Sequence, residues 1–232
     1  MIIERLSNRL KAVASFVEKD AVVADIGSDH AYLPCFLIKT GKIQRAVAGE
    51  VAKGPYDSAM HNVKKEGLAA VVTVRLANGL LAIEEKDAVD TVTIAGMGGS
   101  LIASILENGK SHLQGVKRII TQPNIHAESI RKWAVSNGWE IKDEHIMKED
   151  GKIYEIIVLV EGISSYDELD LLLGPLLRVE KSSVFLEKWM CELEEWQRVL
   201  NSLEKAKATE AIEMKIEQLT RHIELVGKVL EP

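Results

Sequence analysis

Residues 22–34, VVADIGSDHAYLP, decide the fold that we expect for this chain. The stretch begins with an apolar, β-branched run that is too short for a helix and ends at Gly27, which is typical of a buried parallel strand. Gly27 allows a tight turn, and residues 31–40 predict the helix that follows. A strand, a glycine turn and a helix N-terminus together indicate a nucleotide-type cofactor site at the carboxyl edge of an open α/β sheet.

The turn itself is an altered form of a familiar pattern. The usual S-adenosylmethionine version reads acid-x-Gly-x-Gly-x-Gly, and Asp25 and Gly27 match its first two fixed positions. Asp29 and Ala31 stand in place of the other two glycines. Taken alone, the stretch is equally compatible with an ordinary strand–turn–helix, so the downstream pattern has to decide.

Downstream, predicted strands alternate with predicted helices. The expected strands are 43–49, 71–75, 90–95, 116–121, 139–148 and 153–160, and the expected helices are 4–17, 54–67, 100–108 and 126–136. The last two strands are joined by a hairpin turn at 149–152. This order predicts a doubly wound α/β sheet with one antiparallel strand.

Polar and glycine residues follow several of these strands. Glu50 ends the second strand, 23 residues past Gly27, where an acid accepts hydrogen bonds from ribose hydroxyls; the alternative is a surface acid. Asn78 and Gly79 follow the third strand, as an adenine contact or as an ordinary turn. The run Gly-Met-Gly-Gly at 96–99 lets a ligand lie against bare backbone.

Composition narrows the classes of function. The chain has 232 residues and a net charge of −6, which argues against a nonspecific nucleic-acid binder. No apolar run reaches transmembrane length and the N-terminus lacks the plan of a signal peptide. The two cysteines, Cys35 and Cys191, lie in unrelated segments and suggest neither a metal site nor a disulfide. We therefore expect a cytoplasmic protein without metal or membrane partner.

The C-terminal part has a different pattern. Residues 164–232 carry 9 Lys/Arg and 14 Asp/Glu, so most of the net acidity belongs there. Apolar residues spaced by threes and fours predict two helices, broken near 205–209, that form an antiparallel coiled-coil hairpin. The expected domains are 1–163 and 164–232, and a hairpin closed on itself favours a monomer. Arg178, Lys181 and Lys188 are expected to form a basic strip near one helical face.

Several short motifs are shared with one known family. They are DIGSDHAYLP (25–34), AGE (48–50), GPY (54–56), IAGMGG (94–99), QPNIH (122–126) and GKIYE (151–155). With these motifs the whole chain resembles the bacterial tRNA (adenine-22-N1)-methyltransferases. The resemblance implies a class I S-adenosylmethionine methyltransferase fold with strand order 3-2-1-4-5-7-6, a C-terminal coiled coil, and methylation of N1 of an adenine in tRNA. Asn78 stands where an Asp is commoner.

The resemblance and the motifs together give a set of expected site residues. Asp29 and Asn124 are the expected catalytic residues, the first stabilising positive charge on the target base and the second fixing its edge. The expected cofactor contacts are Asp25, Gly27, Ser28, Asp29, His30, Glu50, Val51, Asn78, Gly79, Ala95 and Gly96. The expected RNA contacts are Arg5, Arg9 and Arg131. The alternative for Arg5 and Arg9 is a solvated helix face, and for His30 a structural role.

Two other classes of function stay open on the sequence. A small-molecule methyltransferase of the same fold is favoured by the acidic net charge. A noncatalytic scaffold would use the helical tail as its interaction surface. Tyr154 and Glu155 reach the site only if the hairpin folds toward it, which the sequence does not show.

Overall fold

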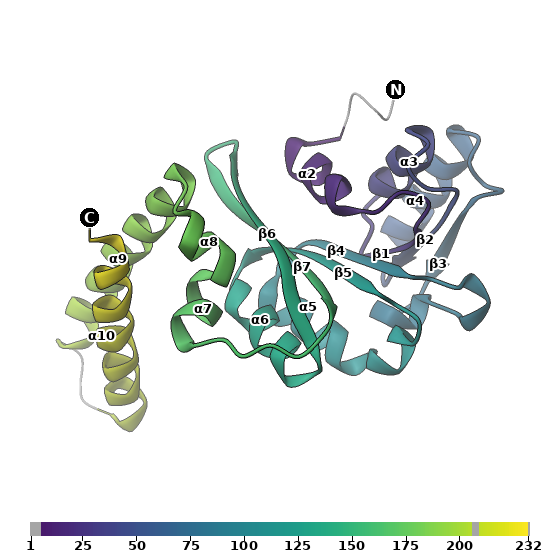
Figure 1. Ribbon diagram of the computed structural model, residues 1–232. Helices are drawn as coiled ribbons and strands as arrows, with labels where there is room; N and C mark the ends of the chain where they lie inside the picture. The colour runs from purple at the N-terminus through teal and green to yellow at the C-terminus, as the bar shows by residue number, and fades with distance from the viewer. Residues whose placement is uncertain (1–5, 206–208, 232) are drawn as a thin grey trace. The chain divides into compact units, whose positions relative to one another are not determined.

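The computed structural model describes residues 6–205 and 209–231. The chain divides into two compact units, Met1–Ser165 and Tyr166–Pro232. The division falls two residues beyond the expected boundary at 163. The first unit is a single sheet with helices on both faces, and the secondary structure described in the second unit is helical (Figure 1). Within the described ranges, no helix is both long and apolar enough to cross a membrane.

The sheet of the first unit has seven strands. Their order is β3-β2-β1-β4-β5-β7-β6, as predicted. β7 runs antiparallel to both of its neighbours, and the other pairings are parallel. The strands are β1 (Val22–Ile26), β2 (Arg45–Glu50), β3 (Val72–Leu76), β4 (Thr91–Gly98), β5 (Arg118–Ile125), β6 (Trp139–Glu149) and β7 (Lys152–Glu161).

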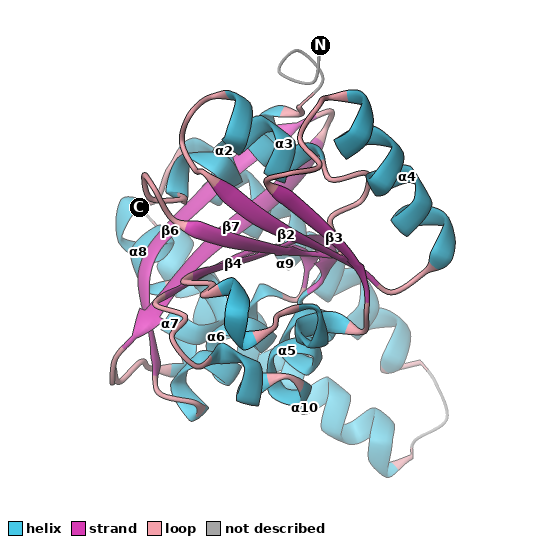
Figure 2. Ribbon diagram, turned by 90° about the vertical axis from the view of Figure 1, so that its right-hand side faces the viewer, coloured by secondary structure: helices cyan, strands magenta, loops and turns pink. Residues whose placement is uncertain are grey.

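Helices cover the two faces of this sheet. α2, α3 and α4 lie on one face, and α5 and α6 lie on the other (Figure 2). Because both faces are covered, the central strand β1 is apolar on both sides, with Val23, Ala24 and Ile26 all buried. The helices are α2 (Asn8–Phe16), α3 (Tyr32–Lys39), α4 (Lys53–Lys65), α5 (Gly99–Asn108) and α6 (Ala127–Ser136), and a short 3-10 helix, η1 (Gly79–Ala82), follows β3.

β4 and β5 extend further than the sequence predicts. The glycine at 96 suggested that β4 ends at Ala95, but the strand continues to Gly98 alongside β5. Two register shifts allow this continuation, between Ala95 and Met97 and between Met97 and Gly98. The extension places the glycine-rich segment directly beside residues 122–125, so both segments reach the carboxyl edge of the sheet together.

The C-terminal unit contains two long helices that pack on each other, preceded by two short ones. They are α7 (Glu168–Leu173), α8 (Pro175–Glu180), α9 (Ser183–Leu203) and α10 (Glu210–Leu230). The short helices were not predicted, although their local signals are clear. Asp167 forms a capping box at the start of α7, Gly174 separates α7 from α8, and Pro175 is the first residue of α8. Residues 206–208, within the expected helix break, lie outside the described residues.

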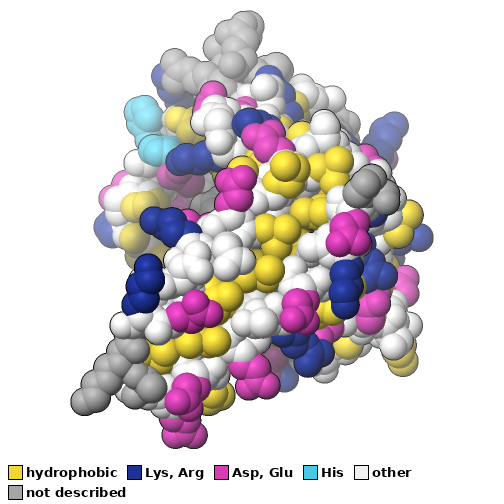
Figure 3. Space-filling model, turned by 90° about the vertical axis from the view of Figure 1, so that its left-hand side faces the viewer, with side chains coloured by type: hydrophobic (Ala, Val, Ile, Leu, Met, Phe, Trp, Pro, Cys, Tyr) yellow, Lys and Arg dark blue, Asp and Glu magenta, His cyan; other side chains and the backbone are white. Residues whose placement is uncertain are grey.

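The apolar spacing of the tail is explained by the packing of its helices. Phe185, Trp189 and Leu200 from α9 and Leu219 and Val226 from α10 are buried. Figure 3 shows the surface on this side of the molecule, where further apolar side chains form a diagonal band with charged side chains on either side. Charged residues in this unit therefore occupy the helix faces that stay in water.

The expected basic strip in the tail is wrong. Arg178 lies in α8 and pairs with Asp167 at 2.9 Å, whereas Lys188 lies in α9 against the ring of Trp189. Lys181 adopts a left-handed conformation at the end of α8 and donates to the carbonyl of Val229 at 2.7 Å. The spacing assumed one continuous helix, but the left-handed cap at Lys181 redirects the chain.

Candidate active site

The turn after β1 has an unusual backbone. Gly27 has a positive φ of 69°, and Asp29, His30 and Ala31 follow with φ of 40°, 69° and 56°. Side chains in the left-handed region cost about 1–2 kcal/mol per residue, so three in succession are retained only where the surroundings demand it. Such strain is concentrated at ligand sites, which agrees with the motif found in the sequence.

Asp25 holds this turn from inside the protein. Its side chain is buried at the end of β1, and it accepts hydrogen bonds from the hydroxyls of Ser28 and Thr93, the second at 2.6 Å. Burial raises the pKa of Asp25, and the two hydroxyl donors oppose that shift. Asp25 and its partner Ser28 therefore fix the shape of the turn from within the protein.

Glu50 is a buried acid whose hydrogen bonding is only partly satisfied by the described residues. It ends β2, is only 5% exposed, and accepts a backbone hydrogen bond from Asp29. Its Oε1 is buried without a hydrogen-bond partner among the described residues. Burial raises the pKa of the Glu50 carboxyl. A buried acceptor left unpaired costs about 1–3 kcal/mol, so this oxygen suits a ligand that brings its own hydroxyl.

The residues beside Glu50 add an apolar surface and an amide. Val51 follows it directly and is 70% exposed. Asn78 is exposed after β3, and Gly79 has a φ of 56°. The amide of Ala77 donates to the carbonyl of Glu50 at 2.8 Å, which ties this turn to the end of β2. An exposed apolar side chain and an exposed amide beside a buried carboxylate fit a nucleoside.

A second group of polar residues lies at the ends of β4 and β5. Ala95 pairs with Gln122, and the amide of Gly96 donates to Gln122 Oε1 at 3.0 Å. Asn124 Nδ2 donates to the carbonyl of Gly96 at 2.8 Å, and Gln122 Nε2 donates to Asn124 Oδ1 at 3.3 Å. Gln122 is fully buried and Asn124 is exposed. This arrangement presents the amide of Asn124 at the surface on a rigid support.

Arg9 reaches the same group from α2. Its Nη1 donates to Gln122 Oε1, and its guanidinium lies over the ring of Tyr154, 5.3 Å from the centroid. The alternative of a purely solvated Arg9 is therefore wrong. Arg5, the other cation expected on this helix, lies outside the described residues.

The RNA contact expected at Arg131 is wrong. Arg131 in α6 is fully buried and forms ion pairs with Glu144 of β6, at 2.7 Å, and with Glu155 of β7. A surface anion cannot reach it, and its charge stabilises two buried carboxylates. Arginine is rarely buried without such partners, and their identity depends on strands that follow later in the chain.

Other functional residues were missed or left open. The sequence marks Gln122 only as part of the motif at 122–126, yet its side chain hydrogen-bonds to Gly96, Asn124 and Arg9. Thr93 has no sequence signal beyond its place in β4. Of the two hairpin residues left open, Tyr154 meets Arg9, whereas Glu155 is buried against Arg131.

The family follows from the whole chain. The sequence model described as TrmK: tRNA (adenine(22)-N(1))-methyltransferase matches residues 23–228. The chain belongs to this family. The TrmK resemblance drawn from the motifs is thereby confirmed.

Individual TrmK relatives agree over nearly the full length. The tRNA (adenine(22)-N(1))-methyltransferase of Bacillus subtilis is 45% identical over 98% of both chains. A Streptococcus pneumoniae protein solved in complex with S-adenosyl-L-methionine is 44% identical, with a TM-score of 0.89 over 97% of this chain and 100% of that one. TrmK of M. capricolum, solved with S-adenosyl-homocysteine, is 30% identical, with a TM-score of 0.85 over 97% and 99%.

Proposed function

We propose that this protein transfers a methyl group from S-adenosylmethionine to N1 of adenine 22 in tRNA, giving N1-methyladenosine. The observation that carries the proposal is the buried Oε1 of Glu50, which has no hydrogen-bond partner within the described part of the chain and lies beside the strained turn after β1. It lies at the same sheet edge as the polar group around Gln122, so one edge offers both a nucleoside acceptor and a rigid surface for a base. The relatives' activity supports this assignment.

The cofactor contacts are assigned from this geometry. Glu50 accepts from the ribose hydroxyls, Val51 covers the adenine ring, and Asn78 accepts from its amino group. The turn from Gly27 to His30 surrounds the amino-acid end, with Ala95 and Gly96 at the neighbouring strand. When bound, S-adenosylmethionine supplies an electrophilic methyl group on a sulfonium.

The chain's own part in the chemistry is positioning and electrostatics. N1 of adenine has a lone pair and needs no deprotonation before it attacks. Positive charge moves onto the base, and a carboxylate near it stabilises the transition state. Asp29 is our choice for that carboxylate, because its side chain is 83% exposed at the turn, 3.5 Å from His30 Nε2. Asn124 holds the edge of the base through its exposed amide.

The tRNA contact is assigned to Arg9. Its guanidinium uses one nitrogen on Gln122, which leaves further N–H donors for a phosphate. The target adenine must leave the RNA stack to reach the sheet edge. We further propose that the protein acts in the cytoplasm, where its substrate is found, and as a monomer, because α9 and α10 cover each other within one chain.

Labelled methyl transfer tests the function. The protein is incubated with methyl-labelled S-adenosylmethionine and bulk unmodified tRNA, which is then digested to nucleosides. Label in N1-methyladenosine, and its loss when a purified substrate tRNA carries guanosine at position 22, is the expected result. A parallel reaction uses an RNase-treated small-molecule extract. Label found there and absent from tRNA would replace the proposal with a small-molecule methyltransferase.

A further inference from the structure

The β6–β7 hairpin extends past the strand that supports it. β5 pairs with β7 over residues 118–121, whereas the β6–β7 pairing continues to Glu149 and Lys152. Asp150 and Gly151 form the turn with φ of 49° and 74°, the pattern of a tight two-residue hairpin loop. The end of the hairpin is thus a two-stranded ribbon beside α2 (Figure 1). A ribbon of two strands is only marginally stable by itself.

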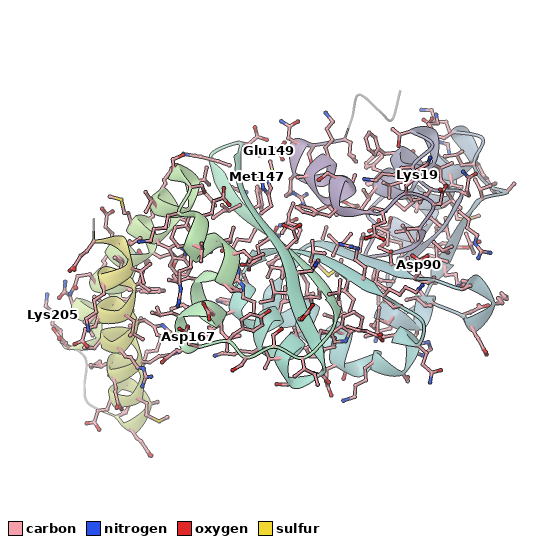
Figure 4. All side chains as sticks on the ribbon, viewed as in Figure 1. Lys19, Asp90, Met147, Glu149, Asp167 and Lys205 are labelled. Carbon is pink, nitrogen blue, oxygen red and sulfur yellow. The ribbon has the colours of Figure 1, made fainter. Side chains whose placement is uncertain are left out.

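Glu149, at the end of β6, binds the N-terminus of α2. Its Oε1 accepts from the amide of Asn8 at 2.6 Å and its Oε2 from the amide of Arg9 at 3.1 Å. Ser7 Oγ accepts from the amide of Leu10 at 3.2 Å, and the Ser7 carbonyl accepts from the amide of Lys11 at 2.9 Å, which is the first regular hydrogen bond of the helix. Figure 4 labels Glu149 at the upper end of the hairpin next to this helix. The amides of the first three helical residues, Asn8, Arg9 and Leu10, which an α-helix leaves without internal partners, are therefore all satisfied.

This cap acts on a helix that needs it. α2 has nine residues, and isolated helices shorter than about 12–15 residues are marginal in water. A carboxylate at a helix N-terminus also interacts favourably with the helix dipole. The first turn of α2 consequently depends on a side chain 140 positions later in the chain.

The same hairpin contacts Arg9 at two places, its backbone amide and its guanidinium. The backbone amide of Arg9 is bound by Glu149, and its guanidinium lies over Tyr154 of β7. Between these two contacts the side chain is directed to Gln122, at the group that presents Asn124. A displacement of the hairpin would move the guanidinium relative to that group.

We propose that Glu149 is a positioning residue for the methylation of tRNA, which acts through Arg9. It fixes the first turn of α2 so that the Arg9 guanidinium stands ready for a phosphate of the target nucleotide. The proposal rests on the proposed function, since it takes tRNA as the substrate. The β6–β7 hairpin thereby links the position of Arg9, which contacts the RNA, to the Gln122 and Asn124 side chains of the site.

A double-mutant cycle tests the proposal on the full-length protein. The variants are Glu149→Gln, Arg9→Ala and the two combined. Asp150→Asn is the matched control, because it removes one negative charge from the adjacent turn residue, and Asn tolerates the left-handed backbone there. Each protein is measured for kcat and KM with tRNA, for S-adenosylmethionine affinity by calorimetry, and for Tm.

The expected result separates function from stability. Glu149→Gln should lower kcat/KM for tRNA about tenfold and leave cofactor affinity unchanged, as Asp150→Asn leaves both. In the Arg9→Ala background, the further loss in kcat/KM should fall below twofold. The decrease in Tm should persist in both backgrounds, because Glu149 binds backbone amides that Arg9→Ala retains.

Other outcomes overturn the proposal at identifiable steps. Equal losses of kcat/KM from Glu149→Gln in both backgrounds would show that Glu149 does not act through Arg9. Full activity of Arg9→Ala would show that Arg9 makes no phosphate contact on which methylation depends. Failure of the proposed function is distinct, because the parent protein would then give no N1-methyladenosine at all. If Glu149→Gln does not fold, Glu149→Asp, which keeps the charge and shortens the reach, replaces it in the cycle.

Discussion

The two halves of the proposed site differ in how completely the chain satisfies its own polar groups. In the cofactor half, Glu50 keeps a buried oxygen without a described partner beside a strained turn. In the target half, Gln122, Asn124, Gly96 and Arg9 hydrogen-bond to one another. An open acceptor gains a full hydrogen bond from a ligand, whereas a satisfied network exchanges one bond for another. Cofactor affinity should therefore depend on single residues more steeply than base recognition does.

The largest expected effect is on cofactor affinity at Glu50. Glu50→Ala removes a charged acceptor worth about 1.5–3 kcal/mol, which corresponds to a roughly 10- to 150-fold rise in Kd for S-adenosylmethionine. Calorimetry measures it directly. Glu161→Ala is the control, because Glu161 is an exposed acid that likewise ends a strand. An unchanged Kd for S-adenosylmethionine in Glu50→Ala would show that Glu50 does not bind the ribose. The proposed difference between the cofactor half and the target half would then be wrong.

Asp29→Asn should act on the rate and spare binding. The substitution keeps the shape of the side chain and removes its charge, so transition-state stabilisation is lost while the turn is retained. Single-turnover methylation should slow by about 10- to 100-fold. We place the effect below that of a fully enclosed group because the side chain is 83% exposed in the free protein. A rate within a few-fold of the parent, with unchanged Tm, would show that Asp29 only shapes the cofactor turn and does not stabilise the transition state.

Asn124→Ala should have a smaller effect. The amide loses its bond to the carbonyl of Gly96, which is 2.8 Å away, but Gln122 still binds the Gly96 amide. We expect kcat/KM for tRNA to fall about 3- to 10-fold with cofactor affinity intact. Steady-state kinetics beside calorimetry check both expectations. A loss of 100-fold or more would mean that the target half depends on one residue as steeply as the cofactor half.

The smallest expected effect is a gain in stability from Glu50→Gln. Burial raises the pKa of Glu50, so its ionised form disfavours folding at neutral pH. That penalty is present above the raised pKa and disappears as the pH falls below the ordinary value for glutamate. Without cofactor, Glu50→Gln should raise the Tm by about 1–3 °C at pH 7.5 and by nothing at pH 4. A lower Tm at pH 7.5 would show that the carboxylate is stabilised by groups of the chain.

Much of the cofactor half follows from the sequence. Alternation of strands and helices places the carboxyl ends of parallel strands at one edge, so Gly27, Glu50 and Asn78 are brought together by chain order alone. Motif resemblance added the strand order, which the sheet confirms. The strain at 29–31 could not be foreseen, because backbone angles of non-glycine residues depend on what surrounds the turn.

The target half was decided by tertiary structure. Arg9, Gln122 and Glu149 come from α2, β5 and β6, and no local pattern links residues 140 positions apart. Arg131 shows the same limit, since a cation on an amphipathic helix is ordinarily exposed, and only the later strands supply the two carboxylates that bury it. Periodicity in the sequence determines which elements form and which of their faces are apolar. The partner of a polar side chain is chosen by packing between distant segments, and that choice exists only in the folded protein.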